Sequence, residues 1–463
     1  MSTQQPGQRG LGIWMLTALV AGNMIGSGIW LLPASLGSIG SIGIVAWILT
    51  AIGSIFIALV FANMSTIMPR TGGPYAYCHA AFGDFVGFIM AYNYWVALFI
   101  GNAAVAVAFV GYLSIFFPAL SHNAGLSFVV GAASLWFVAI INIVGVRSAG
   151  VVQLVTTVLK ILPLIVMGTV GLFFIHIPNL QDFNITGTSN LSALTTAATI
   201  TLWSFIGLES ATVPAEAAEN PKRNIARATI YGTLIAATVY ILSATAVMGI
   251  LPHTALANST APYADAAKVI FGNTGGLLIA LGAAISCFGA LNGWTLLLGQ
   301  IPLAAARDGL FPKVFAKETA NGTPALGLIV STVLATLLMA LTLNQSLVTQ
   351  FTLMILLATL ASSIPYLFTT MAELLLFINY REQFNSKRLW LSSTIAILAC
   401  AYAFWAIIGS GPQIVYYGAL LLFSGVPIYV WVKWRAAEEE RGIMNDELEK
   451  VTPSGDASHE ISH

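Results

Sequence analysis

Long apolar stretches alternate with short polar ones along most of the chain. An apolar run of about 18 residues or more is long enough to cross a bilayer core as a helix. Twelve such runs can be delimited, and the third, eighth and tenth are long enough to tilt or extend past the membrane. They cover residues 12–34, 42–65, 84–117, 125–145, 151–175, 193–216, 226–251, 274–306, 325–344, 348–378, 389–409 and 413–433. The pattern predicts an all-α integral membrane protein with twelve transmembrane helices.

The composition supports a membrane protein and argues against other classes. Of the 463 residues, 57% are hydrophobic and 8% are charged, whereas soluble domains carry about 25% charged residues. A β-barrel would show short alternating strands instead, and the first apolar run is too long for a cleavable signal peptide. The cysteines Cys78, Cys287 and Cys400 lack the paired spacing of a metal site. The formal net charge of zero predicts no nucleic-acid partner.

The basic residues indicate an orientation. With the N-terminus inside, every Lys and Arg except Lys160 and Lys268 falls in an inside segment, as expected for cytoplasmic loops. We therefore expect a cytoplasmic N-terminus over 1–10 and a disordered cytoplasmic tail over 435–463. The tail ends in a formal HExxH match at 459–463. A polar terminus supplies neither the packed helix nor the further ligand of a zinc site, so no metal site is expected there.

The first apolar run contains the sequence AGNMIGSGIW at 21–30. Irregular backbone at membrane depth persists only where it is buried in protein or lines a cavity. Glycines at 26 and 28 favour such a break and leave room for a ligand beside the backbone. A close helix crossing through small residues is the alternative interpretation.

The sixth run repeats this pattern, with Gly207 beside the ionisable Glu209. Interrupted helices in corresponding spans of two halves indicate a transporter built from inverted repeats. The halves would be residues 11–178 and 190–380, with spans eleven and twelve at 388–434 outside the repeat. N–H groups at the start of a second half-helix suit a carboxylate, and free carbonyls at the end of a first half-helix suit an ammonium. An α-amino acid carries both groups.

Three charged residues fall well within the predicted spans, and such residues are functional candidates. Glu209 adjoins a break and could take up and release protons, or it could be a structural residue bonded across helices. Lys160 could replace a bound cation or carry a proton, or it could pair with carbonyls. Glu373 lies near the cytoplasmic Arg381, so we expect it to snorkel or to pair.

Several motifs resemble those of the amino acid–polyamine–organocation (APC) superfamily, over about residues 10–435. Within it, the chain is similar to the basic amino acid/polyamine antiporters, and most similar to those that exchange arginine for agmatine. The motifs are GNMIGSGIWLLP at 22–33, TGGPYAY at 71–77, IGN at 100–102, LWSFIGLESA at 202–211, ENPKRN at 219–224, GWTLLLGQ at 293–300 and DGLFP at 308–312. The resemblance implies a five-plus-five inverted-repeat fold with broken helices one and six, and one-for-one exchange by alternating access.

The resemblance also implies roles for particular residues. Ser27 and Gly28 would meet the substrate carboxylate, Trp203 would stack on the substrate, and Asn102 would reach a guanidinium. The carbonyls that would accept from the amino group belong to Met24, Trp203 and Ile206. The implied substrate-binding set is Asn23, Met24, Ile25, Gly26, Ser27, Gly28, Ala97, Asn102, Val105, Trp203, Ser204, Ile206, Trp294 and Ala358. The implied gating and proton-coupling set is Tyr75, Glu209, Tyr366 and Lys160. Simple packing remains the alternative for Trp203 and Trp294, and an interhelical hydrogen bond for Asn102.

Some positions depart from the antiporter pattern. Val105 replaces a methionine, Leu98 a cysteine, Ala358 a serine and Trp30 a phenylalanine; the first three concern the distal side-chain pocket. Lys160 resembles a lysine of proton-coupled members of the superfamily, where it occupies a sodium-like site. Arginine specificity is therefore open.

We expect a secondary transporter of the bacterial inner membrane that exchanges an arginine-like cationic amino acid for an agmatine-like amine. A proton-coupled or exchange carrier for neutral amino acids that uses Lys160 is the alternative. An enzyme would need a nucleophile–base pair or metal cluster within the spans, and a channel would need a continuous pore lining; neither pattern is found in the sequence. No catalytic residue and no cofactor is implied. The expected partners are small amino-acid or amine substrates, the lipid bilayer and a second copy of the chain in a homodimer.

Overall fold

The computed structural model describes residues 11–451 except 71, 145, 214, 216–217, 321 and 380–385. The described residues form helices and connecting turns, and their only β-type pairing is an isolated bridge between Leu11 and Ala218. The HExxH match at 459–463 lies outside the described residues. The prediction of an all-helical chain is confirmed for the part that is described.

The main helices are α1 (Ile13–Met24), α2 (Ser27–Gly37), α3 (Ile42–Ile67), α4 (Pro74–Phe82), α5 (Asp84–Leu113), α6 (Ala119–His122), α7 (Ala124–Val144), α8 (Val146–Thr169), α9 (Asn190–Leu202), α10 (Pro221–Ile250), α11 (His253–Asn258), α12 (Pro262–Arg307), α13 (Ala325–Leu341), α14 (Leu347–Asn379), α15 (Ser386–Gly409), α16 (Pro412–Phe423) and α17 (Val426–Val451). Proline occupies the first position of α4, α10, α12 and α16. This position suits proline, because its missing N–H would have no partner inside the helix.

Ten helical segments within the described residues are long and apolar enough to cross a membrane. They coincide with ten of the twelve predicted spans. Shorter apolar helices over Thr156–Thr169 and Ala325–Leu341 stand where the fifth and ninth spans were predicted. The chain is therefore a multi-pass membrane protein.

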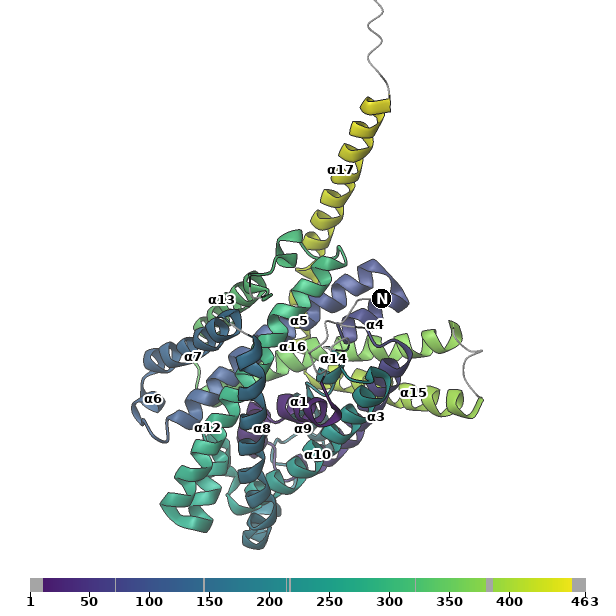
Figure 1. The fold of residues 1–463 in the computed structure, drawn as a ribbon. Coiled ribbons are helices and arrows are strands. Elements are labelled where there is room, and N and C mark those ends of the chain that lie inside the picture. Colours follow the sequence, from purple (N-terminus) through teal and green to yellow (C-terminus); the bar gives the residue numbers. More distant parts are fainter. Residues whose placement is uncertain are drawn as a thin grey trace, which may run out of the picture.

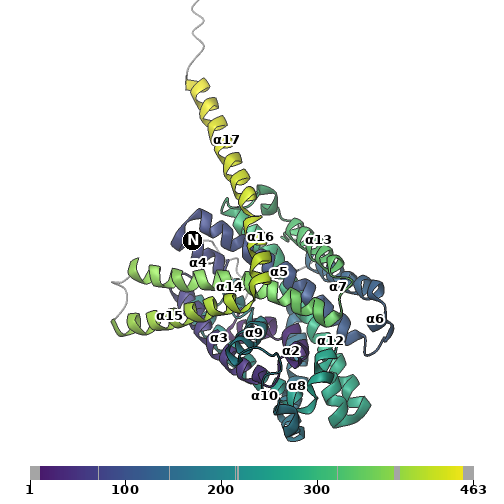
Figure 2. The ribbon, with the colours of Figure 1, turned by 180° about the vertical axis from the view of Figure 1, so that it is seen from behind.

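Helix α5 is the most enclosed of the spans and packs most extensively against α12 and α14. Helix α1 lies near the centre of the body, and α14 and α15 run side by side toward one edge (Figures 1 and 2). The apolar residues that face outward are the surface expected to meet lipid. This arrangement places the first break and the middle of α5 inside the protein.

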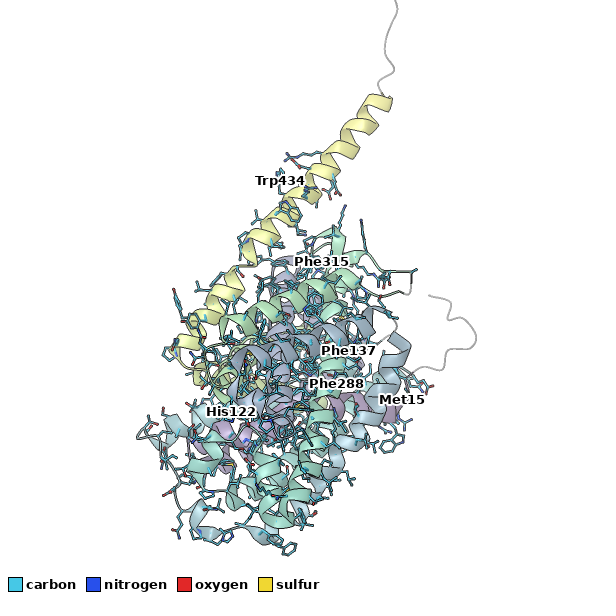
Figure 3. The ribbon with its side chains drawn as sticks, turned by 90° about the vertical axis from the view of Figure 1, so that its left-hand side faces the viewer. Met15, His122, Phe137, Phe288, Phe315 and Trp434 are labelled. Carbon is cyan, nitrogen blue, oxygen red and sulfur yellow. The ribbon has the colours of Figure 1, made fainter. Side chains whose placement is uncertain are left out.

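Helix α17 extends away from the body, as Figure 3 shows for its part around Trp434. Only the first part of this helix is apolar. Residues 435–451 are helical, although we expected disorder from residue 435 onward. Glu439 on this helix pairs with Lys313, which follows the end of α12. Contact with the body therefore continues beyond the predicted last span.

Candidate functional site

The first span is interrupted between two helices. Helix α1 ends at Met24 and α2 begins at Ser27, with non-helical backbone angles at Ile25 and at Gly26 (φ −119°, ψ −140°). The break coincides with the glycines that predicted it. It leaves N–H groups at the start of α2 without helical partners, as at every helix start.

Carbonyls around the first break accept hydrogen bonds from other helices. The Lys160 ammonium donates to the carbonyl of Gly22, and the Trp294 indole N–H donates to the carbonyl of Asn23 at 3.1 Å. Lys160 is fully buried in the structure. The sequence left open whether Lys160 replaces a bound cation or carries a proton, or instead pairs with a backbone carbonyl. The hydrogen bond to Gly22 is of the last kind.

The sixth span is interrupted over a longer stretch. Helix α9 ends at Leu202, a 3₁₀ turn follows over Trp203–Phe205, and a second one covers Ser210–Thr212. Between them Gly207 has φ +108°, a conformation that glycine adopts without strain. The glycine that predicted this break therefore occupies a position that requires it.

The two breaks touch each other. The Asn23 side chain donates to the Ser210 hydroxyl at 2.9 Å. A Cβ atom built on Gly28 would lie 2.3 Å from the Ser204 Oγ and 3.0 Å from Cδ1 of Trp203. Only a glycine at position 28 allows this approach, so the second half of the first span lies directly against the sixth.

A pocket opens where the breaks meet, and we refer to it as the central pocket. Its lining residues come from the first break, α5, the sixth break and α12: Asn23, Met24, Gly26, Ser27, Gly28, Val105, Trp203, Ile206 and Trp294. All nine belong to the predicted substrate-binding set. The space between the lining residues is about 190 Å³, a figure that includes room open to the surroundings, so the pocket is narrow in this structure.

The other five predicted substrate-binding residues, Ile25, Ala97, Asn102, Ser204 and Ala358, are buried but do not line the central pocket. Their predicted contacts with substrate remain predictions.

Two indole rings form one wall of the central pocket. The ring centroids of Trp203 and Trp294 are 5.1 Å apart and their planes are inclined by 51°. Tryptophan presents the strongest cation–π face among the aromatic residues. The lining contains no Asp or Glu, so a cation in this pocket would be recognised by aromatic faces and neutral polar groups.

Three polar side chains at or next to the central pocket have no hydrogen-bond partner within the described part of the chain. They are the hydroxyls of Ser27 and Ser204 and both amide atoms of Asn102, and all three side chains are at least 99% buried. An unpaired buried polar group costs about 1–3 kcal/mol. Such groups gathered around one pocket indicate a site that is completed by a polar ligand or by water.

The carboxylate of Glu209 is held by three donors. The Tyr94 hydroxyl donates to one oxygen, and the Tyr366 hydroxyl donates to the other at 2.5 Å. The Gly207 N–H donates to that second oxygen at 3.2 Å. The structure thus brings together Glu209 and Tyr366, two members of the predicted gating and proton-coupling set. It places the carboxylate beside the sixth break and outside the pocket lining.

Tyr75 contacts a different carboxylate. Its hydroxyl donates to Asp308, which also pairs with Arg70 at 3.3 Å. Burial, together with the hydrogen bond to Asp308, raises the pKa of Tyr75 above its usual value. Of the four residues predicted for gating or proton coupling, Tyr75 therefore belongs to an ion-pair cluster of its own.

For Glu373, the expectation of snorkelling is wrong, and that of pairing stays a prediction. Its side chain is fully buried, so it does not snorkel toward a surface. Arg381, near which we expected it to lie, is outside the described residues.

Comparison with known proteins identifies the family. The sequence profile of the amino acid permeases matches residues 11–432. The chain is 34% identical to the putrescine transporter PotE of Haemophilus influenzae, over 92% of this chain and 97% of that protein. It is 35% identical to a putative arginine/ornithine antiporter of Bacillus subtilis, over 93% and 98% of the two chains. It is also 35% identical to a cadaverine/lysine antiporter of Escherichia coli, over 86% and 90%.

The chain belongs to the amino acid permease family. This confirms the resemblance to the APC superfamily and to its basic amino acid/polyamine antiporters. The relatives are named as transporters and antiporters, in agreement with the interpretation of this permease as a transporter and not an enzyme.

Sequence reasoning missed two residues of this permease. Tyr94 was not named, although a tyrosine hydroxyl inside a membrane span needs a partner and could have been paired with the only carboxylate near the breaks. Gly101 appeared only as part of the IGN motif. A Cβ atom there would lie 2.5 Å from Cζ3 of Trp294, which no sequence signal reveals.

Proposed function

We propose that this permease exchanges a cationic amino acid for its amine decarboxylation product by alternating access. The observation that carries the proposal is the central pocket itself. It combines the Ser27 hydroxyl at the start of α2, which has no hydrogen-bond partner among the described residues, with the indole pair of Trp203 and Trp294. One end suits a carboxylate and the other suits a cation.

The carboxylate end rests on the helix start. The first N–H groups of α2 are available because no preceding turn accepts from them, and the positive end of the helix dipole favours an anion there. The hydroxyl of Ser27 adds a further donor. An amine product lacks the carboxylate, so it would bind without this part of the site.

The cation end rests on aromatic faces and on the amide of Asn102. Asparagine can orient a guanidinium or ammonium without a competing charge. The relatives named for ornithine, putrescine, lysine and cadaverine make these compounds candidates beside arginine and agmatine. Val105 lines the pocket where the arginine/agmatine pattern has a methionine, so the arginine-like pair is one candidate among three.

We propose that alternating access depends on the inverted-repeat architecture that the sequence predicts. We infer twelve spans, with α8 and α13 as the fifth and ninth, arranged as repeats over 11–178 and 190–380. The two breaks lie in the first and sixth spans, which correspond in the two repeats. The distribution of basic residues supports cytoplasmic termini and an inner-membrane location, and we retain the homodimer as part of the proposal.

A neutral amino-acid carrier is the second candidate function. The observation that favours it is Lys160, whose fully buried ammonium donates to the Gly22 carbonyl at the first break. The Lys160 ammonium would gain and lose a proton during the transport cycle, so a neutral substrate could be carried together with a proton.

The test is uptake of labelled arginine, ornithine or lysine at acidic pH into liposomes carrying the purified protein. The vesicles are loaded with agmatine, putrescine or cadaverine, or left empty. Uptake only into loaded vesicles, with one pair fastest, is the expected result and would identify the substrate pair. Uptake of a neutral amino acid such as alanine, with none of the cations transported, would replace the proposal by the Lys160 mechanism.

A further inference from the structure

The two indole rings of the central pocket rest on the same residue of α5. A Cβ atom built on Gly101 would lie 2.5 Å from Cζ3 and 3.1 Å from Cε3 of Trp294, and 2.8 Å from Cη2 of Trp203. Distances below 3.0 Å cannot be accommodated without movement of the rings. The hydrogen atom of glycine is therefore what allows both indoles to lie against α5.

The position of Gly101 relative to the pocket determines where the rings would move. Both indoles line the central pocket, whereas Gly101 does not. The rings therefore stand between Gly101 and the open space. Any side chain at position 101 would push them away from α5 and toward the first break.

The neighbouring residues on this face of α5 also lie close to the central pocket. Residues four apart on a helix share a face, so Ala97, Gly101 and Val105 form one row, and Val105 lines the central pocket. The next residue, Asn102, carries the amide that has no hydrogen-bond partner within the described ranges. Gly101 thus lies in the part of α5 that is directed at the ligand site.

We propose that Gly101 is a specificity-determining residue that sets the depth of the central pocket. By letting both indoles rest against α5, it sets the longest cationic chain that the site accepts. The inference rests on the proposed function and refines its substrate class to linear cations of limited length. Gly101 acts through Trp203 and Trp294 and is a positioning residue.

The same helix supplies a matched control. A Cβ atom on Gly111 would lie 2.9 Å from the Thr260 carbonyl oxygen, and Gly111 does not line the central pocket. Gly111→Ala therefore crowds α5 to a similar degree without touching the indoles. An effect shared by Gly101→Ala and Gly111→Ala would reflect general crowding of the helix.

The experiment measures competition by linear diamines of increasing length, from propane to hexane derivatives, against labelled substrate in liposomes carrying the full chain. Gly101→Ala should lower the apparent affinity for the longest accepted diamine by about tenfold, the scale of excluding one methylene from an apolar pocket. The shortest diamines should be nearly unaffected, and Gly111→Ala should leave the order of preference unchanged.

A second substitution tests whether position 101 acts on the substrate through the indole ring of Trp294. In Gly101→Ala combined with Trp294→Phe, the smaller ring removes the Trp294 atoms that meet the added methyl group, whereas Cη2 of Trp203 still meets it. The longest diamine should therefore regain part of its relative affinity. If the alanine variant does not reach the membrane, Trp294→Phe alone should shift preference toward longer diamines. An equal loss for all lengths, or no recovery in the double variant, would overturn the role of Gly101.

The outcome also separates this inference from the proposed function. A wild-type protein that exchanges none of the cations would overturn both. A wild-type protein that exchanges them, with the same length preference in Gly101→Ala, would overturn only the inference.

Discussion

The two interrupted spans differ in which polar groups at the break have hydrogen-bond partners within the protein. The first break is short, resumes as a helix at Ser27 and leaves the Ser27 hydroxyl without a partner in the described part of the chain. The sixth unwinds through 3₁₀ turns, and its Glu209 carboxylate accepts from Tyr94, Tyr366 and the Gly207 N–H. The first keeps donors available for a ligand, whereas the second has its charged group fully engaged. We propose that the first break binds the substrate carboxylate, and that Glu209 at the sixth break responds to conformation or protonation while Trp203 beside it contacts the substrate.

The largest effect is expected where the two breaks meet. Gly28→Val would place atoms inside the contact with Ser204 and Trp203, where a Cβ atom alone would be 2.3 Å from the Ser204 Oγ. Overpacking costs about 1–3 kcal/mol, so we expect substrate affinity to fall by roughly 100-fold as both breaks are displaced. Equilibrium binding of labelled substrate in detergent measures it.

Gly125→Val is the control for Gly28→Val, because a Cβ atom at the exposed Gly125 meets only Asn123 at 3.4 Å. Wild-type affinity in the Gly28 variant would show that the breaks need not touch for binding.

The next effect concerns the cation end. Trp294→Ala removes one of the two aromatic faces and the hydrogen bond to the Asn23 carbonyl. A cation–π contact is worth about 0.5–2 kcal/mol, so affinity should fall by roughly 2- to 30-fold for the amino acid and the amine alike. Trp390→Ala, at a side chain that is 73% exposed, should bind as the wild type does. Unchanged affinity in Trp294→Ala would remove that residue from the recognition of cations.

A smaller and more selective effect is expected at the first break. Ser27→Ala removes a hydroxyl that could donate to the substrate carboxylate. A hydrogen bond to a charged group contributes about 1.5–3 kcal/mol, and the neighbouring N–H groups remain, so we expect about a tenfold loss for the amino acid. The amine has no carboxylate and should bind unchanged. Equal losses for amino acid and amine, measured in the same competition assay, would contradict a carboxylate site at Ser27.

The smallest change in affinity is expected at the sixth break. Glu209→Gln keeps the shape of the side chain but cannot take up a proton, so exchange should become less dependent on pH while binding changes little. The measurement is the rate of exchange across a series of pH values. Glu373→Gln is the matched control, since Glu373 is also fully buried but lies on α14. An unaltered pH profile in Glu209→Gln would exclude a proton role for that residue.

Local signals in the sequence located much of the helical framework and both breaks. Hydropathy identified the apolar runs because each span must satisfy its backbone within itself. Glycines marked both interruptions. Gly207 has φ +108°, which favours glycine, and a Cβ atom on Gly26 would lie 3.0 Å from the Cβ of Ala290. The resemblance to the family named every residue that lines the central pocket, although the roles of those residues remain predictions.

The sequence by itself determined the apolar spans, their interruptions and the membership of the family. Each of these properties depends on residues that are close together in the chain. Only the tertiary structure decided which side chains meet. The hydroxyl of Tyr94 donates to Glu209, and that of Tyr75 donates to Asp308. The indole rings of Trp203 and Trp294 pack against Gly101. Each of these contacts joins residues far apart in the chain. They depend on how helices rotate and cross, and these angles are set by the packing of whole surfaces against each other and not by any local pattern.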